Sequence, residues 1–221
     1  MSANPSDIRI ETFVEPMFGE NGFVISVQDG GPCWIVDPGF PPQCEEILMY
    51  ITRHQLKPAA IVLTHGHADH IAGVEHILRD WPDLPIWIGR EDDRMLIDAH
   101  ANLSAPFGVC LRAPKSADKF LDPGAKLELD GTVWYVLDTS GHSPGGRSLY
   151  CPKAGAVVVG DALFAGSVGR TDFPGSDGAR LVRNIREQLF ALPDKTVVYS
   201  GHGPTTTIGR EKRTNPFVGK D

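Results

Sequence analysis

The sequence predicts an α/β fold in which two mixed β-sheets pack face to face and helices cover the outside of each sheet. Strand-like segments alternate with helix-like segments in the first half of the chain, and strands followed by a helix recur in the second half. The 221 residues are 41% hydrophobic and 22% charged, so the chain can bury one sizeable core. We therefore expect residues 1–221 to form a single domain.

The first half of the chain begins with two segments of alternating pattern, which predict antiparallel strands. The apolar run at residues 59–63 predicts a strand buried on both faces. Residues 42–54 carry Ile47, Leu48 and Ile51 at helical spacing and predict an amphipathic helix. Strands are expected at residues 8–14, 22–27, 33–36, 59–63 and 86–88, and helices at residues 42–54, 71–79 and 91–99.

The second half is richer in strands, which we expect at residues 126–129, 133–137, 147–150, 156–159 and 196–199. A helix is expected at residues 179–190, with Leu181, Ile185 and Leu189 facing inward. Between the halves, residues 100–123 are irregular and interrupted by proline and glycine. A loop of this length favours a lid or a substrate-facing segment over a linker.

A cluster of histidines directly follows the buried strand at residues 59–63. His65 and His67 are two residues apart and project to one side in extended backbone, whereas Asp69 and His70 lie where the next helix is expected to begin. Three imidazoles and a carboxylate in one turn are ligands that zinc and similar divalent cations accept. The alternative is a polar surface loop without a metal.

Three more candidate ligands, His142, Asp161 and His202, each follow an expected strand. Loops at one rim of rigid strands can bring distant residues into a single cleft, and the neighbouring glycines permit close backbone approach. His54, His76 and His100 have no such partners in the sequence, so we assign none of them to a metal.

Four segments together resemble the metallo-β-lactamase superfamily. They are the motif from His65 to His70, Gly-His-Ser-Pro-Gly at residues 141–145, Val-Val-Gly-Asp-Ala-Leu-Phe at residues 158–164 and Tyr-Ser-Gly-His-Gly at residues 199–203. Residues 169–175 and 206–217 are most similar to the short bacterial members of its glyoxalase II group. The resemblance implies a four-layer αββα sandwich of two mixed sheets.

The resemblance also implies a pair of divalent metal ions, for which zinc is expected and iron or manganese are alternatives. It places His65, His67 and His142 on one ion, Asp69, His70 and His202 on the other, and Asp161 between them. Such a set leaves room for a bridging water or hydroxide, which is typical of catalytic sites. The loop at residues 37–39 lines the site in the family, so Asp37 either supports a ligand or only forms a turn.

The implied function is hydrolysis of S-acyl thioesters such as S-lactoylglutathione. Metal-bound hydroxide would attack the carbonyl, with Asp69 orienting it, and the ion at His65, His67 and His142 would hold the oxyanion. Asp161 stands where common zinc β-lactamases use cysteine, which disfavours lactam hydrolysis. A thiolate also leaves without a dedicated proton donor, and no further acidic residue is placed as one.

The chain departs from the full-length glyoxalase II enzymes in two ways that bear on the substrate. Only 19 residues follow His202, so the helical C-terminal domain that contacts glutathione is not expected. Arg170 aligns with their glutathione-binding lysine, but Asp172 replaces a nearby tyrosine. Arg170 therefore either binds substrate or anchors Asp172.

Two other functions remain open from the sequence. A mononuclear iron persulfide dioxygenase of the same superfamily would use only His65, His142 and Asp161. A non-catalytic metal-binding module would keep the fold without turnover.

Composition bears on partners and location. A formal charge of −7 argues against nucleic acid and anionic membrane surfaces as partners. The four cysteines are widely spaced, as expected for free thiols in a reducing compartment. Residues 1–5 lack a basic region followed by an apolar run, and no stretch reaches the roughly 18 apolar residues of a membrane helix, so a cytoplasmic location is expected. The sequence does not determine the oligomeric state.

Overall fold

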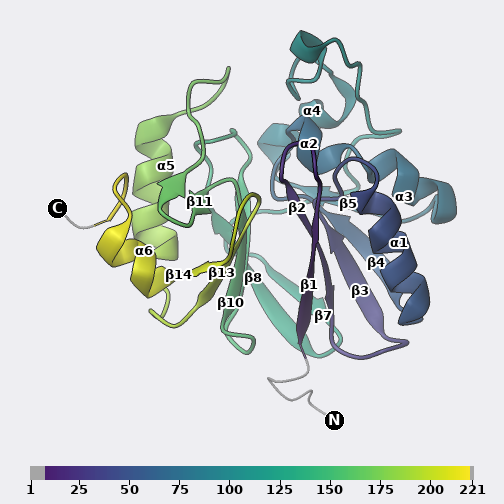
Figure 1. Ribbon diagram of the computed structural model, residues 1–221, viewed down its shortest axis with the longest axis horizontal. Coiled ribbons are helices and arrows are strands. Elements are labelled where there is room, and N and C mark those ends of the chain that lie inside the picture. The colour runs from purple at the N-terminus through teal and green to yellow at the C-terminus, as the bar shows by residue number, and fades with distance from the viewer. Residues whose placement is uncertain (1–7, 220–221) are drawn as a thin grey trace.

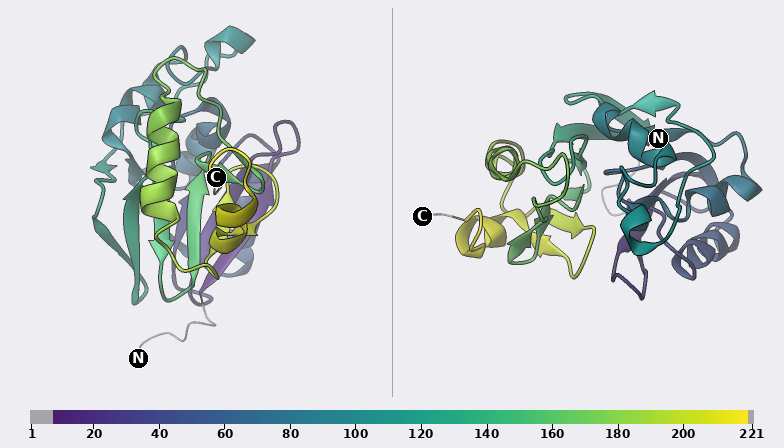
Figure 2. Two further views of the ribbon diagram at one scale, coloured as in Figure 1. Left: turned by 90° about the vertical axis from the view of Figure 1, so that its left-hand side faces the viewer. Right: turned by 90° about the horizontal axis from the view of Figure 1, so that it is seen from above.

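Two six-stranded sheets lie face to face at the centre of the molecule, and helices cover both outer faces (Figure 1). The computed structural model describes residues 8–219. Viewed from above, the two sets of helices lie on opposite sides of the paired sheets (Figure 2). The four-layer αββα fold expected from the sequence is confirmed.

The first sheet has the strand order β1-β2-β3-β4-β5-β6. Its first three strands are antiparallel, and β3 to β6 are parallel. Helices connect the parallel strands, as the alternation of strand and helix predicts. The elements are β1 (Arg9–Val14), β2 (Asn21–Ser26), β3 (Pro32–Val36), α1 (Gln43–Arg53), β4 (Lys57–Val62), α2 (Ala68–Ile71), α3 (Val74–Asp80), β5 (Ile86–Ile88), α4 (Asp93–Ile97) and β6 (Lys119–Phe120).

The second sheet has the order β14-β13-β10-β9-β8-β7, in which β10 and β13 are parallel and the other neighbours are antiparallel. A small hairpin of β11 and β12 stands beside it. The elements are β7 (Lys126–Leu129), β8 (Thr132–Asp138), β9 (Arg147–Cys151), β10 (Ala156–Gly160), β11 (Leu163–Phe164), β12 (Ser167–Val168), α5 (Gly178–Asn184), β13 (Val197–Ser200), β14 (Thr206–Thr207) and α6 (Ile208–Thr214).

The strand β3 shows how one segment is buried on both faces. Trp34 points toward the second sheet and packs edge-on against Trp134, with 6.0 Å between ring centroids. Its neighbour Ile35 points the other way and joins the apolar layer beneath α1 and α3. A third layer, containing Leu181, Ile185 and Leu189 as expected, lies between the second sheet and its helices. Burial of these three layers holds the two sheets in place.

Several predicted boundaries were wrong. The helix expected at residues 71–79 begins at Ala68 and is broken between α2 and α3. The break lies at Gly73, whose amide donates to Pro38 O at 2.8 Å and where an added Cβ would stand 2.6 Å from Gly39 O. The helix expected at residues 91–99 is a 3₁₀ turn followed by the five-residue α4. The helix expected at residues 179–190 is α5 continued by a wider π turn, Ile185–Leu189.

The short strands β6, β11, β12 and β14 were not predicted, because two-residue strands carry no periodic pattern. The seven-residue helix α6 was also missed. The segment of residues 100–123 is irregular as expected, apart from β6 and a single 3₁₀ turn, Ala105–Phe107. Asn102 O accepts the Ala68 amide at 2.9 Å, which attaches this segment to the start of α2. Its role as a lid stays a prediction.

All four cysteines lie in the described part of the chain and are free thiols, as expected. Among residues 8–219, no helix is long and apolar enough to span a bilayer. Residues 1–5, where we expect no targeting signal, lie outside the described residues.

Candidate metal centre

The seven side chains singled out in the sequence come together around the start of α2, which Figure 1 labels just below α4. His65, His67, Asp69 and His70 lie on the turn after β4 and on α2. The others follow strands of the second sheet: His142 lies beyond β8, Asp161 directly after β10 and His202 beyond β13. The site therefore stands where the rims of both sheets meet.

His65, His67 and His142 form the first group, with their nitrogen atoms within 4.8 Å of one another. The closest approach is 2.9 Å, between His67 Nδ1 and His142 Nε2. All three rings are buried. Imidazole nitrogens this close together point at one position, which suits a single cation.

Asp69, His70 and His202 form the second group, also with ligand atoms within 4.8 Å. His202 Nε2 lies 3.3 Å from Asp69 Oδ2, and His70 Nε2 lies 3.9 Å from the same oxygen. His70 is fully buried, whereas Asp69 and His202 are partly exposed. This group therefore faces the solvent side of the site.

Asp161 lies between the two groups. Its Oδ1 is 3.3 Å from His70 Nε2, and its Oδ2 is 3.5 Å from both His142 Nε2 and His202 Nε2. The backbone nearby is packed so closely that a Cβ at Gly201 would stand 2.3 Å from Asp161 Oδ1. One carboxylate thus lies within 3.5 Å of histidines of both groups, a position from which it could bridge two ions.

Four of the histidines share one arrangement: Nδ1 faces a hydrogen-bond acceptor outside the site, and Nε2 faces inward. A donated Nδ1–H fixes the tautomer that leaves Nε2 free to bind a metal. The contacts are His65 Nδ1 to Thr64 Oγ1 (3.1 Å), His70 Nδ1 to Asp37 Oδ2 (3.0 Å), His142 Nδ1 to Arg170 O (2.7 Å) and His202 Nδ1 to Phe18 O (3.2 Å).

Three inward-facing atoms, His65 Nε2, His70 Nε2 and Asp161 Oδ1, are buried without a hydrogen-bond partner. Such atoms are rare in folded proteins, and each costs about 1–3 kcal/mol when left unsatisfied. A bound cation would satisfy all three. The donor set and its unsatisfied atoms therefore fit a pair of divalent metal ions.

The pKa values of the buried histidines shift in opposite directions in the two groups. Burial lowers the pKa of His65 well below its ordinary value, with His70 adding to the effect, and it lowers the pKa of His67 to about 3, with His142 adding to it. Burial acts the same way on His70, but the carboxylates of Asp69 and Asp161 outweigh it and raise its pKa. The lowered pKa values of His65 and His67 favour the neutral imidazoles that a metal requires, whereas at His70 a cation would compete with a proton.

Asp37 does more than form a turn. Its backbone lies in the left-handed region, with φ of 47°, which directs the carboxylate back toward the site. The buried carboxylate accepts hydrogen bonds from Thr64 N at 2.7 Å, from Thr64 Oγ1 at 2.6 Å and from His70 Nδ1 at 3.0 Å. Asp37 therefore orients His70 and the backbone that precedes His65.

Asp92 connects the two ligand loops and was missed in the sequence. Its fully buried carboxylate accepts from Gly66 N at 3.2 Å, between His65 and His67, and from Ser143 Oγ at 2.7 Å and Gly145 N at 2.6 Å. Three acceptor contacts hold a loop of the first sheet against a loop of the second. In sequence Asp92 sits in an acidic run, 91–93, that resembles an exposed helix start, so no local pattern identifies it.

Glu20 was also missed. It is fully buried, accepts from Gln43 Nε2 at 2.6 Å and lies 3.7 Å from His70 Nδ1. Burial raises its pKa well above the ordinary value, although the charge of His70 opposes the effect. Glu20 and Gln43 thus pack behind His70, on the side away from the site.

Arg170 contacts a candidate ligand through its backbone and Asp172 through its side chain. Its carbonyl is the acceptor for His142 Nδ1. Its guanidinium forms two hydrogen bonds with Asp172, Nε to Oδ1 at 2.9 Å and Nη2 to Oδ2 at 2.7 Å. The anchoring contact that the sequence left open is therefore present.

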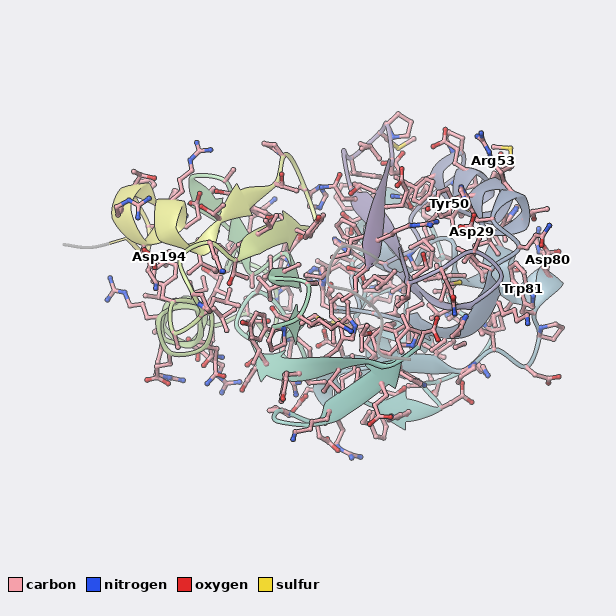
Figure 3. The ribbon with its side chains drawn as sticks, turned by 90° about the horizontal axis from the view of Figure 1, so that it is seen from below. Asp29, Tyr50, Arg53, Asp80, Trp81 and Asp194 are labelled. Carbon is pink, nitrogen blue, oxygen red and sulfur yellow. The ribbon has the colours of Figure 1, made fainter. Side chains whose placement is uncertain are left out.

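The remaining histidines lie outside both groups. His54 Nδ1 is 3.2 Å from Asp29 Oδ1, at the end of the molecule where Figure 3 labels Asp29 and Tyr50. In the described part of the chain, no candidate metal group contains His54, His76 or His100.

Comparison with known protein families also points to a metal-dependent protein. The sequence model of the metallo-beta-lactamase superfamily matches residues 18–202, which is most of the chain. The chain belongs to the metallo-beta-lactamase superfamily. That range contains all seven side chains of the site.

Two relatives each match more than four fifths of the chain. The probable metallo-hydrolase YqgX of Bacillus subtilis is 38% identical over 84% of this chain and 87% of its own length. The hydroxyacylglutathione hydrolase GloC of Haemophilus influenzae is 35% identical over 83% of this chain and 86% of its own.

Two solved superfamily structures are also similar. BLEG-1, described as a B3 metallo-beta-lactamase, superposes with a TM-score of 0.88 at 34% identity, over 95% of this chain and 99% of that one. TTHA1623 in a di-iron-bound form superposes with a TM-score of 0.79 at 36% identity, over 93% of this chain and 98% of that one.

Proposed function

We propose that the protein is a dinuclear metal-dependent hydrolase that cleaves S-acyl thioesters such as S-lactoylglutathione. The observation that carries the proposal is the convergence of seven side chains into two adjoining groups with Asp161 between them. His65, His67 and His142 would hold one ion, and Asp69, His70 and His202 the other. The similarity to GloC, a hydroxyacylglutathione hydrolase, supports this substrate class.

When bound by these two groups, divalent cations would supply hydroxide near neutral pH and polarise a carbonyl oxygen. The chain's own residues add orientation. Asp69 lines the pocket above the site and is partly exposed, so its carboxylate can accept a proton from water or hold it in line with a bound carbonyl. Although burial opposes the effect, the charge of protonated His70 lowers the pKa of Asp69 in the metal-free protein, and a bound cation would favour the ionised carboxylate in the same way.

The residues around the site favour a leaving group that needs no proton. The described residues that line the pocket include no lysine, tyrosine, cysteine or glutamate, and their only carboxylates are Asp69 and Asp161. In thioester hydrolysis the C–S bond breaks as a C–O bond forms, and the thiolate takes its proton from solvent. An amine, in contrast, requires a positioned acid. The lining thus supports a thioester over an amide or lactam.

The nature of the metal ions is part of the proposal. Zinc is the expected ion. Iron is the alternative, because the similar protein TTHA1623 has been solved in a di-iron-bound form. A mononuclear iron dioxygenase would need only His65, His142 and Asp161. It would leave the second group, with its inward-facing His70 Nε2, without a role.

The test is hydrolysis of S-lactoylglutathione by metal-loaded protein, compared between wild type, His67→Ala and the control His76→Ala. We expect His67→Ala to lose at least about 100-fold in kcat/KM and His76→Ala to match wild type, because His76 lies outside both groups. Equal rates for wild type and His67→Ala would end the proposal.

The same preparations separate the other functions. Oxygen uptake on glutathione persulfide with one iron per chain would indicate a persulfide dioxygenase. Hydrolysis of a cephalosporin alone would indicate a lactamase such as BLEG-1 is described to be. Two bound ions without turnover of any substrate would indicate a binding module.

A further inference from the structure

The pocket above the metal centre has walls that are largely aromatic. Its volume is about 610 Å³, within the range of small-molecule sites. Phe173 stands at one side of the centre, 5.5 Å from the ring of His67, and Phe164 stands at the other, 6.0 Å from the ring of His202. Phe18 and Phe40, with 5.8 Å between their rings, extend the second wall.

Large apolar side chains at the mouth of this pocket are left in contact with water. Phe107 is 76% exposed and Val109 44% exposed, both on the segment that follows Asn102. Phe18, on the loop between β1 and β2, is 48% exposed. Exposed apolar groups gathered at a pocket mark a ligand site more often than chance exposure. An apolar group of a ligand would cover them.

The positive charge that Arg170 brings to the pocket is already paired with a carboxylate of the protein. Arg170 is the only lysine or arginine among the described lining residues. Asp172 binds the Nε–Nη2 edge of its guanidinium and neutralises its charge, and the Phe173 ring centroid lies 4.4 Å from Arg170 Cζ. A substrate carboxylate would therefore have to compete with Asp172 for the ion pair.

We infer that this site selects thioesters with an uncharged, apolar acyl chain and does not recognise the carboxylates of a thiol such as glutathione. The inference rests on the proposed thioester hydrolysis. The acyl chain lies against the aromatic walls, where each methylene removed from water strengthens binding. The substrate class is thus an alkanoyl thioester, and the thiol contributes little to recognition.

The test compares kcat/KM for acetyl, butanoyl, hexanoyl and octanoyl thioesters of two thiols, glutathione and N-acetylcysteamine, which lacks carboxylates. We expect about a two- to fourfold gain for each methylene from acetyl to hexanoyl. Exchange of the thiol should change kcat/KM by less than about threefold. Chain-length values that agree within threefold, or a loss of tenfold without the glutathione carboxylates, would overturn the inference.

Two variants test which side chain determines the preference for longer acyl chains. Phe107→Ala should lower the ratio of hexanoyl to acetyl kcat/KM by at least threefold, whereas Phe217→Ala should leave the ratio unchanged. Phe217 is a matched control because it is 60% exposed but does not line the pocket. An unchanged ratio of hexanoyl to acetyl kcat/KM in Phe107→Ala would overturn the claim that Phe107 contacts the acyl chain.

Asp172→Asn tests the ion pair. Releasing Arg170 should lower KM for the hexanoyl thioester of glutathione at least threefold relative to that of N-acetylcysteamine. An equal KM ratio in the variant and wild type would contradict the claim that Asp172 blocks a carboxylate site. Cleavage of every thioester at one rate would leave the proposed function intact and refute only the selectivity, whereas cleavage of none would refute the proposed function itself.

Discussion

Replacing Asp92 with asparagine should destabilise the metal-free protein by about 2 kcal/mol. The amide oxygen can still accept from Gly145 N, and the Ser143 hydroxyl can turn to accept from the new NH₂ group. Gly66 N then has no acceptor, and a buried unsatisfied amide costs about 1–3 kcal/mol. Burial raises the pKa of Asp92, so loss of its charge offsets part of the cost. For a chain of this length, we expect the midpoint of thermal unfolding to fall by about 4–8 °C.

Asp92→Ala leaves both amides unsatisfied, so its cost should be about twice as large. Urea unfolding of protein stripped of metal gives the two values, with Asp122→Asn as the control. The Asp122 carboxylate is 65% exposed, so this change should stay within about 0.5 kcal/mol of wild type. Metal affinity of Asp92→Asn should fall about tenfold, because the loops that carry His67 and His142 are no longer tied together. A free energy of unfolding equal to that of wild type in Asp92→Ala would refute this reasoning.

Three further predictions concern metal binding and the thiols. Asp37→Ala should weaken one of two metal-binding steps about 10- to 100-fold in a chelator competition, because His70 loses its acceptor; two unchanged steps would contradict this. The pKa values of His70 and His202 are raised in the metal-free protein, so metal binding should release protons and weaken as the pH falls; calorimetry that gives the same binding enthalpy in two buffers of different ionisation enthalpy would refute this. An aromatic disulfide reagent should modify only the exposed Cys110 in native protein and four thiols after denaturation, since burial raises the pKa of Cys33 to about 12; a second fast thiol would be inconsistent.

The candidate ligand set could be predicted from the sequence because most of it lies close together. Four side chains of types that bind metals lie within the six residues from His65 to His70, just after a run of apolar residues that predicts a buried strand. The later candidates were predicted from their position after strands, and the structure brings all of them within reach of the first four. The layers of the fold follow from the same strand patterns.

Asp37 was considered as a supporting residue, but Asp92 and Glu20 could not be predicted, because their roles depend on contacts between distant segments. The break at Gly73 is set by Pro38 and Gly39, more than thirty residues earlier. Asp92 looks like the exposed start of a helix until the loop after His142 folds over it. The aromatic wall is likewise built from phenylalanines that are far apart in the sequence, and no sequence pattern shows that they meet.

The central claim is that these seven side chains hold two metal ions, and metal stoichiometry tests it most directly. Metal-free protein would be titrated with zinc, freed of excess by gel filtration and measured by elemental analysis. We expect two ions per chain in wild type and one in both His142→Ala and His202→Ala, which each remove a ligand from one group. One ion or none in the wild-type chain, or two in both variants, would contradict the account.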